Sequence, residues 1–271
     1  MSGVALAGES VPWKLTPIAW GDLLGTLETC PTTWSTISSC SFPRTMKGST
    51  MREKFSRRRL PHWDLPGATY FITTCLLGSI PAQGLVEIER FRISLERQSK
   101  PAGLSVEDWK ARQWKQVFAK HDDWLDRRPA VRHLEDSRLA EEVEKSLKHF
   151  AGERYDLIAW VVMPSHYHWV FRPLDEWVRS LGPATDERSP RQRIQHSVNR
   201  HSALECNKLL GETGGFWQRE SYDHCVRDED ELERIVAYLH GNPVVPGLVE
   251  RAEEYRFSSA REFALREGRA R

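Results

Sequence analysis

The stretch RYDLIAWVVMPSHYHWVFRP, residues 154–173, contains two apolar segments separated by a proline and a serine. Both segments are rich in β-branched and aromatic residues, the composition that strands favour. Because Pro164 cannot donate a ladder hydrogen bond, Pro164-Ser165 predicts the turn between two antiparallel strands. Alternate residues of a strand point to the same side of a sheet, so His166 and His168 are expected on one face.

Strands and helices alternate along the rest of the chain, which favours an α+β fold in which helices pack on one face of an antiparallel sheet. Residues 51–265 are expected to form one domain with a helical insertion over about 86–136. Residues 1–50 are rich in Ser, Thr, Gly and Pro and predict a poorly ordered extension. The further elements are expected as a strand over 67–77, a helix over about 189–210 that stops at Gly211, a strand over 221–227 and a helix over 228–242.

The composition restricts the class of protein. The chain has 271 residues, of which 28% are charged, a mean hydropathy of −0.56 and a net charge of +1. Apolar runs are too short to span a membrane. The five cysteines are scattered and form no CxxC pair, which favours a reducing cytoplasm. Since the net charge is near zero, any affinity for nucleic acid must come from local basic clusters, and two are present at 51–63 and 188–201.

The histidine pair has two open interpretations. Imidazoles at i and i+2 of a strand can converge on one divalent cation, including Mg²⁺ when oxygen ligands complete the site. They are equally compatible with two hydrogen-bonded core histidines, which is the commoner case for an isolated HxH. A histidine-triad hydrolase would need a third histidine at position 170, where the chain has Val170.

The helix over 228–242 places a tyrosine at the edge of the core. Asp228 is suited to cap its N-terminus, and Pro243 ends it. Tyr238 and Asn242 are i, i+4 neighbours on one flank of the apolar stripe. We expect the Tyr238 ring to be half-buried with a solvated hydroxyl, and Asn242 to be exposed enough to reach a ligand. The stripe that faces the sheet is expected to be Leu232, Ile235, Val236 and Leu239.

Several motifs in order resemble the single-tyrosine HUH transposases, and in particular the branch called REP-associated tyrosine transposases. These motifs are VVMPSHYHWVFRP, GGFWQRESYDHCVRDEDELERIVAYLHGNPVVPGLVE and YRFSSAR, with RLPHWDLPGATYFITTCLL resembling the opening segment of that branch. The resemblance covers about Arg59 to Arg261. It implies a ferredoxin-like catalytic domain that acts on single-stranded DNA, often next to a hairpin.

The resemblance also implies roles for individual residues. His166 and His168 match the metal ligands, Tyr238 matches the nucleophile, and Asn242 matches an amide residue that can complete the metal site. The implied reaction is Mg²⁺- or Mn²⁺-dependent cleavage and strand transfer through a 5′-phosphotyrosine, by a monomer or a homodimer. Two positions depart from the family, namely Ser165, where Asn is usual, and Asn199, where a lysine is common. The candidate DNA-binding residues are Arg57, Arg58, Arg59, Arg191, Arg193 and Arg200.

Two other functions stay open. A domesticated relative would hold hairpin DNA without cutting it, and would have no need of His166, His168 and Tyr238 together. A nuclease that releases its products to water would not require Tyr238. Trp217 is expected either to stack on unpaired bases or, more often for such a residue, to pack in the core.

Overall fold

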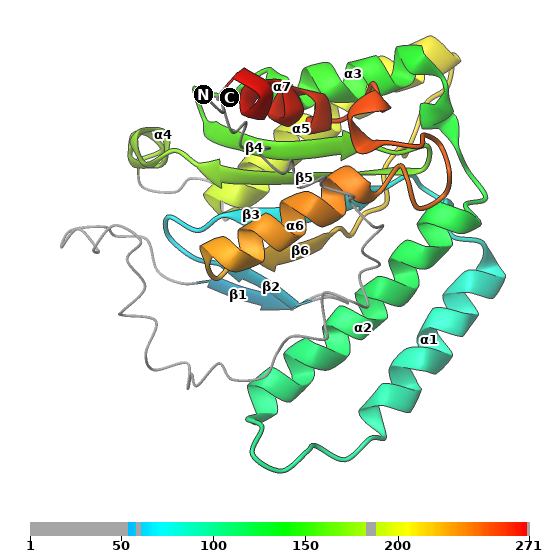
Figure 1. The fold of residues 1–271 in the computed structure, drawn as a ribbon, viewed down its shortest axis with the longest axis vertical. Coiled ribbons are helices and arrows are strands. Elements are labelled where there is room, and N and C mark those ends of the chain that lie inside the picture. Colours follow the sequence, from blue (N-terminus) through cyan, green and yellow to red (C-terminus); the bar gives the residue numbers. More distant parts are fainter. Residues whose placement is uncertain (1–53, 58–60, 183–187, 270–271) are drawn as a thin grey trace, which may run out of the picture.

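A computed structural model describes residues 54–57, 61–182 and 188–269 (Figure 1). A four-stranded sheet with the order β4-β5-β3-β6 forms its centre, and all neighbouring strands are antiparallel. The strands predicted over 67–77, 154–173 and 221–227 are confirmed. Their bounds are Tyr70–Cys75 for β3, Tyr155–Val162 for β4, His166–Pro173 for β5 and Tyr222–Cys225 for β6.

Helices connect and cover these strands. The order β3-α3-β4-β5-α5-β6 is the β-α-β-β-α-β arrangement of a ferredoxin-like fold, which confirms the expected fold class. Helices α1 and α2 are inserted between β3 and α3 and lie side by side at one end of the molecule (Figure 1). The bounds of the longer helices are Ala82–Glu96 for α1, Val106–Arg127 for α2, Ser137–Lys148 for α3, Pro190–Leu210 for α5 and Glu229–Gly241 for α6.

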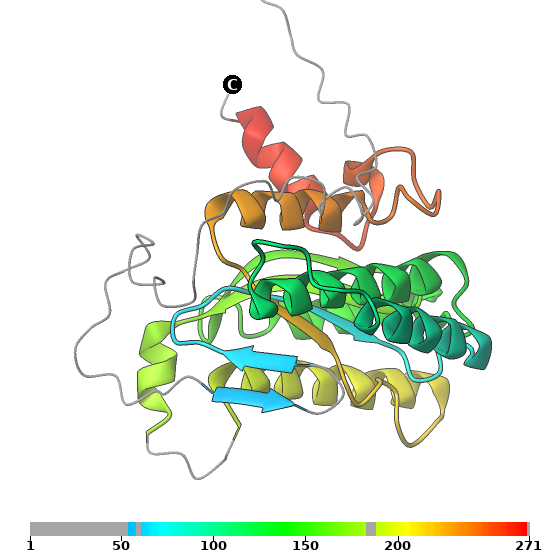
Figure 2. The same ribbon diagram turned by 90° about the horizontal axis from the view of Figure 1, so that it is seen from below.

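Shorter elements complete the described part of the chain. An antiparallel hairpin of β1 (Lys54–Arg57) and β2 (Pro61–Asp64) forms a separate two-stranded sheet (Figure 2). Helix α4 spans Asp175–Ser180 and helix α7 spans Ala260–Arg269. Two 3₁₀ turns, η3 and η4, span His133–Glu135 and Ala252–Glu254.

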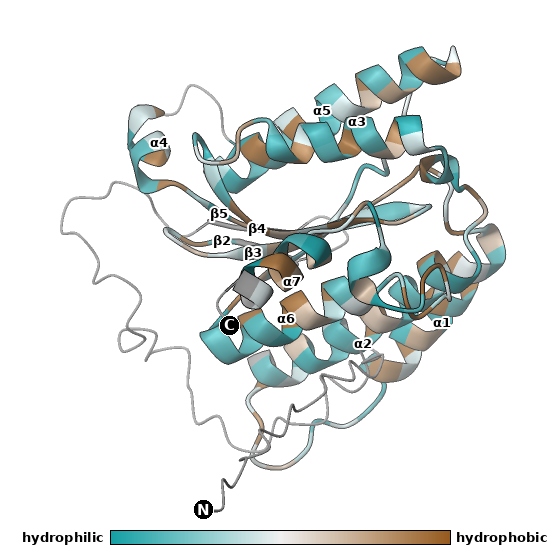
Figure 3. Ribbon diagram, turned by 45° about the horizontal axis from the view of Figure 1, so that its top comes forward, coloured by the Kyte–Doolittle hydropathy of each residue, from teal (hydrophilic) through white to brown (hydrophobic). Residues whose placement is uncertain are grey.

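We had expected helices on only one face of the sheet, but the structure has helices on both faces (Figure 3). On one face, β-strand residues such as Trp169 and Phe171 pack against Val143 of α3 and Val198 of α5. On the other face, residues around Phe71 pack against α2 and α6. The difference arises because the inserted α2 and the C-terminal α6 supply a second apolar surface. The histidine pair therefore lies under helices and away from solvent.

The ends of two helices follow from local sequence. Ser189 and Gln192 form a capping box at the start of α5, and Gly211 ends that helix with a φ of 68°. The Asp228 side chain accepts a hydrogen bond from the backbone N–H of Glu231 at the start of α6. Both helices were predicted at these positions, and the predictions are confirmed.

Two further expectations concern the N-terminal extension and membrane-spanning helices. The extension over residues 1–50 lies outside the described residues. Among the residues that the structure describes, none of the helices is both long enough and apolar enough to cross a bilayer.

Candidate metal and nucleophile site

The alternation of strand β5 places the histidines as predicted. His166 and His168 face α2 and α6, while Tyr167 and Trp169 belong to the cluster on the opposite face. Both imidazoles are 0% exposed. Pairing with β3 sets Thr73 opposite His168, so the Thr73 hydroxyl lies directly beside that ring.

The two imidazoles turn their Nε2 atoms toward each other, 3.0 Å apart. The Ser165 hydroxyl donates to the carbonyl oxygen of Leu125 and lies 2.9 Å from His166 Nδ1. Because that hydroxyl has one hydrogen, it accepts from His166 Nδ1–H, which leaves a lone pair on His166 Nε2. Thr73 Oγ1 lies 2.7 Å from His168 Nδ1 and can accept in the same way. In that tautomer both Nε2 lone pairs point at one place, as ligands of a cation do.

Helix α2 brings two carboxylates to the same place. Asp122 Oδ1 lies 3.6 Å from His168 Nε2, and Asp126 Oδ1 lies 3.6 Å from His166 Nε2. The ligand atoms of Asp122, His166 and His168 all lie within 4.8 Å of one another. Within the described residues, the Oδ1 atoms of Asp122 and Asp126 are buried and have no hydrogen-bond partner. Buried oxygens of this kind are the groups that a bound cation would satisfy.

Helix α6 supplies the tyrosine and the amide. The rings of Tyr238 and His168 are 5.8 Å apart at their centroids, and Tyr238 also packs edge-on against Phe71. Asn242 Nδ2 lies 3.3 Å from His168 Nε2, and its Oδ1 is buried without a hydrogen-bond partner in the described structure. Rotation of the amide by 180° would turn that oxygen toward the histidines.

The accessibility of these two α6 residues differs from the sequence prediction. Tyr238 is 5% exposed and Asn242 is 1% exposed, so the first is not half-buried and the second does not reach solvent. The prediction counted only the packing of α6 on the sheet. Helix α2, carrying Phe118, covers the flank that an isolated α6 would expose.

Burial sets the protonation of the site. It lowers the pKa of His168 to about 3 and places the pKa of His166 well below its usual value. Burial also raises the pKa of Asp126 to about 8 and raises that of Asp122 well above its usual range. Without a cation, neutral imidazoles and protonated carboxyls are therefore favoured. A divalent cation would favour the carboxylates, and mixed nitrogen and oxygen ligands fit Mn²⁺ and other divalent metals.

We did not predict Asp122 and Asp126 from the sequence, because we interpreted residues 86–136 as a helical insertion and named no site residue in it. A signal was present in the segment HDDWLDR, residues 121–127, where the two aspartates are i, i+4 neighbours on a helix. Asp122 lies close to the C-terminal end of α2, where the helix dipole disfavours a negative charge, so helix stability does not explain a buried carboxylate there.

The candidate DNA-binding arginines differ in their surroundings. Arg191 is 2% exposed, and its guanidinium pairs with Asp64 at 2.6 Å and with Asp223 at 3.4 Å, so it faces carboxylates rather than solvent. Arg193 is partly exposed and donates to the carbonyl oxygen of Arg188, while Arg200 is exposed on α5. Arg57 ends β1, and Arg58 and Arg59 lie outside the described residues.

Two other positions have structural contacts. Asn199, the departure from the family's lysine, accepts a hydrogen bond from the Tyr167 hydroxyl. Trp217 is 9% exposed, and its Nε1 donates to Ser202 Oγ at 3.0 Å. Trp217 therefore packs in the core, the second of the two expected roles.

Comparison with known proteins supports the resemblance seen in the motifs. No family model matches the chain. A Haemophilus influenzae protein named putative REP-associated tyrosine transposase is 25% identical over 111 residues, which are 39% of this chain and 58% of that protein. The chain thus matches less than two thirds of its relative's length. The chain is also similar to the structure of a REP-associated tyrosine transposase bound to a REP hairpin. The match covers 78% of this chain and 87% of the other chain, with 17% identity and a TM-score of 0.37.

The resemblance to REP-associated tyrosine transposases is confirmed in that a curated relative carries that name.

Proposed function

We propose that this protein cleaves and rejoins single-stranded DNA through a covalent bond to Tyr238. The observation that carries the proposal is the convergence of Asp122, His166 and His168, with the Tyr238 ring against His168. A nucleophile beside a buried set of metal ligands is the arrangement that metal-assisted phosphodiester transfer needs. The curated relative is named a transposase, which supports the same class of reaction.

The residues fit a divalent metal, Mg²⁺ or Mn²⁺. Asp122, His166 and His168 would hold it, and the Asn242 amide oxygen would complete the set after rotation of the amide. Such an ion, when bound, polarises the scissile phosphate as a Lewis acid. The hydroxyls of Ser165 and Thr73 would hold the imidazoles in the tautomer that leaves Nε2 free to bind.

The chemistry of Tyr238 follows from its hydroxyl. Its oxygen would form a bond to phosphorus while the bond from phosphorus to the 3′-oxygen breaks. The hydroxyl of Tyr238 would lose its proton, and the departing 3′-oxygen would gain one and become a 3′-hydroxyl. The product is a 5′-phosphotyrosine and a free 3′-hydroxyl. Because an aryl phosphate ester is reactive, a 3′-hydroxyl of another strand can reverse the step without ATP.

DNA would enter only when helix α2 or α6 moves, because the ligands and Tyr238 are buried. These helices are connected by an ion pair between Lys115 Nζ and Glu231 Oε1 at 3.2 Å.

Arg193 and Arg200 on α5, with the basic cluster at 57–59, would bind phosphates of the strand or of an adjacent hairpin. The catalytic unit would span about 51–265, as a monomer or homodimer. The free thiols of Cys75, Cys206 and Cys225 fit a reducing cytoplasm.

The test incubates end-labelled single strands that carry a hairpin with the protein and Mg²⁺ or Mn²⁺. We expect a protein–DNA band that survives denaturation and is absent in Tyr238→Phe. Tyr222→Phe is the matched control, because Tyr222 contacts Phe71 from the same face of the sheet. This variant should leave the band intact. Cleavage that persists in Tyr238→Phe would instead identify a nuclease. Binding without cleavage under either metal would identify a domesticated hairpin-binding protein.

A further inference from the structure

Helices α1 and α2 form a pair with an apolar core of its own. Ile88 and Leu95 of α1 pack there with Trp124 of α2, and Cys75 is the one member of this cluster that comes from the central sheet. The helices approach closely, because a Cβ atom at Gly84 would lie only 2.8 Å from the Trp124 ring. The pair is therefore built to move as one body.

Two neighbouring segments connect this pair to the rest of the molecule. The backbone N–H of Ala130 donates to the carbonyl oxygen of Ser79 at 2.7 Å, which joins the segment after α2 to the segment before α1. Gly78, next to this bond, has a φ of 77°, a conformation that favours glycine. Leu134 is fixed to the turn between β4 and β5 by its backbone N–H. The two connections thus meet at one place and can act as a hinge.

The surface that α2 turns toward the metal site is only partly apolar. Phe118 stacks on Tyr222 with ring centroids 3.8 Å apart. The next turns of α2 bring Asp122 and Asp126, whose Oδ1 atoms are buried without a hydrogen-bond partner in the described structure. Leaving such oxygens unsatisfied destabilises this position of α2. A cation that binds them would stabilise it.

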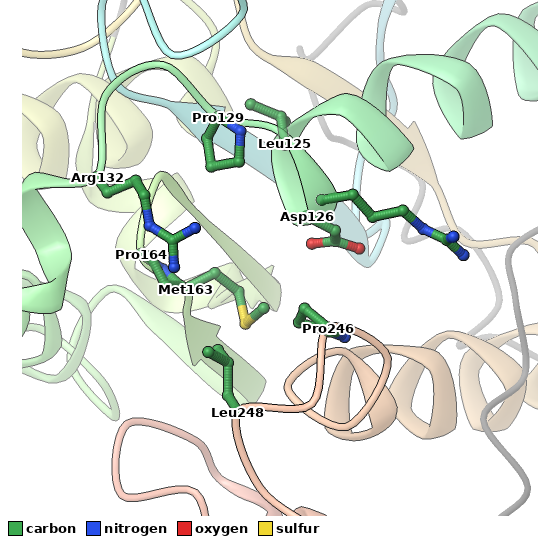
Figure 4. Close-up of a pocket in the computed structure, with 9 residues that line it drawn as sticks. Leu125, Asp126, Pro129, Arg132, Met163, Pro164, Pro246 and Leu248 are labelled. Atoms are coloured by element: carbon green, nitrogen blue, oxygen red, sulfur yellow. The ribbon is translucent and has the colours of Figure 1, made fainter.

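Two features of the boundary between α2 and α6 allow the helices to separate. A pocket of about 230 Å³ lies between Pro129, just after α2, and Pro246 in the loop after α6 (Figure 4). Nearer the start of both helices, Lys115 Nζ lies 3.2 Å from Glu231 Oε1. The Glu231 carboxylate also accepts from the Arg227 guanidinium at 2.7 Å. It therefore keeps a charged partner when Lys115 moves away.

Helix α6, in contrast, is held at β4, an edge strand of the sheet. His240 Nε2 lies 2.9 Å from Ser259 Oγ, which accepts a hydrogen bond from the backbone N–H of Trp160. The backbone N–H of Ser259 donates to the carbonyl oxygen of Trp160, and the Tyr255 hydroxyl donates to that of Val162. Because these contacts fix α6 to the sheet, α2 is the helix that can leave the site.

From these contacts we infer that the α1–α2 pair is a lid, which opens to admit the DNA strand and closes when a divalent cation binds. Asp122 belongs to the lid, whereas His166 and His168 belong to the sheet, so the three ligands converge only when the lid is closed. A cation held by all three favours the closed position. The inference rests on the proposed function for the identity of the cation and the strand, but the movement can be measured without cleavage.

Closure of the lid also sets the tautomer of His166. In the closed position the Ser165 hydroxyl donates to the carbonyl oxygen of Leu125 in α2 and accepts from His166 Nδ1–H. When α2 moves away, the hydroxyl loses this acceptor and can donate to Nδ1 instead, which places the proton on Nε2. The closed lid therefore prepares His166 to bind the cation.

The experiment measures two distances in the full-length protein by double electron–electron resonance. Spin labels are attached to unnatural amino acids at exposed positions, so that the native cysteines are not labelled. One pair joins Gln98, just after α1, to Glu233 of α6, and the other joins Lys145 of α3 to Glu233. In EDTA we expect two populations for the Gln98–Glu233 distance, of which the longer is the open lid. Saturating Mg²⁺ should reduce the longer population at least about fivefold. The Lys145–Glu233 distance should not change.

Variants of α2 test the cause of the movement. Asp122→Asn should retain the longer population in Mg²⁺, because the lid no longer brings a carboxylate to the cation. Asp123→Asn is the matched control, since Asp123 is an exposed neighbour on the same helix, and it should respond to Mg²⁺ like the wild type. Lys115→Met should increase the longer population in EDTA, because it removes the ion pair with Glu231.

The inference is overturned if the Gln98–Glu233 distance is single and identical in EDTA and Mg²⁺, both in the wild type and in Lys115→Met. It is also overturned if the Lys145–Glu233 distance changes instead, because α6 would then be the moving helix. Failure of the proposed function looks different. If the lid closes on Mg²⁺ but no strand ever becomes covalently attached, the lid stands and the transesterase does not. If strands become attached while neither distance changes, the transesterase stands and the lid does not.

Discussion

Strand β5 borders two surfaces that differ in what they bury. Toward α3 and α5 it presents Tyr167, Trp169 and Phe171, which join an apolar cluster containing Tyr155. Toward α2 and α6 it presents His166 and His168, which meet carboxyl groups.

Both surfaces are fully buried, yet only the second collects groups whose charge depends on their surroundings. Burying titratable groups destabilises a fold unless a partner compensates for the lost hydration. The comparison therefore separates a face that stabilises the fold from a face that is arranged to bind a ligand.

The largest expected effect is on the histidine face. His168→Ala should lower the rate of covalent DNA attachment by about 10³-fold, because Lewis-acid catalysis contributes several kcal/mol to the transition state. Tyr167→Phe is the control on the other face of the same strand, and it should keep its rate while losing only the hydrogen bond to Asn199. Rates are measured with labelled strands under single-turnover conditions. Equal rates for His168→Ala and the wild type would remove the distinction between the faces.

The converse change tests the apolar face. Trp169 is fully buried and stacks on Phe171 with ring centroids 4.0 Å apart. Trp169→Ala should lower the free energy of unfolding by about 3–5 kcal/mol, the cost of a cavity left by a large aromatic side chain. Urea unfolding followed by far-UV circular dichroism measures it. A loss below about 1 kcal/mol would mean that this face is not the stabilising one.

The protonation of the histidine face predicts a pH dependence. Burial raises the pKa of Asp126 to about 8, while a carboxyl in the unfolded chain titrates near 4. The folded state therefore keeps a proton that the unfolded state releases, and this stability is lost as the pH rises toward 8. The buried histidines act in the opposite sense, since their contribution is lost as the pH falls below about 6.5. Between pH 6.5 and 8 only the carboxyls change.

Across that window the metal-free protein should lose about 2 kcal/mol of stability for each of the two carboxyls, Asp122 and Asp126, at about 1.4 kcal/mol for each pH unit. Urea unfolding in EDTA at the two pH values measures the loss. Asp126→Asn should remove about half of the loss, whereas Asp123→Asn, at an exposed neighbouring position, should leave it unchanged. Adding Mn²⁺ should also reduce the loss, because a bound cation keeps the carboxylates ionised and paired. Stability that rises over this window would contradict the buried carboxyls.

The residues on and around β5 show which parts of the site could be predicted from the sequence. The alternation of the strand and the apolar stripe of α6 are local patterns, so they predicted the histidine face and the helix that carries Tyr238. Asp122 lies on α2, and α3 and β4 separate it in the chain from the histidines of β5. Only tertiary packing brings Asp122 to them. The same reason explains why Tyr238 is more buried than expected, since it shares a buried cluster with Phe118 of α2.

The basic cluster at 188–201 shows a different limit. We expected Arg191 to bind DNA because arginines cluster there, but it precedes Ile194 and Val198 by three and seven positions and so continues the buried stripe of α5. Its partner Asp64 lies 127 residues earlier, and no local pattern could identify it. The stripe could have shown that Arg191 points inward, but not which charge it meets.

The smallest expected effect concerns the arginine that remains at the surface. Arg200 is exposed on α5, whereas Arg191 on the same helix is held by carboxylates. Arg200→Ala should weaken binding of a single strand several-fold at low salt and reduce the slope of log affinity against log salt by about 1, because one phosphate contact is lost. Fluorescence anisotropy of the Tyr238→Phe protein measures this without cleavage. Arg90→Ala on α1, another exposed arginine, should leave the slope unchanged, and an equal change in both variants would mean that α5 is not a DNA-binding surface.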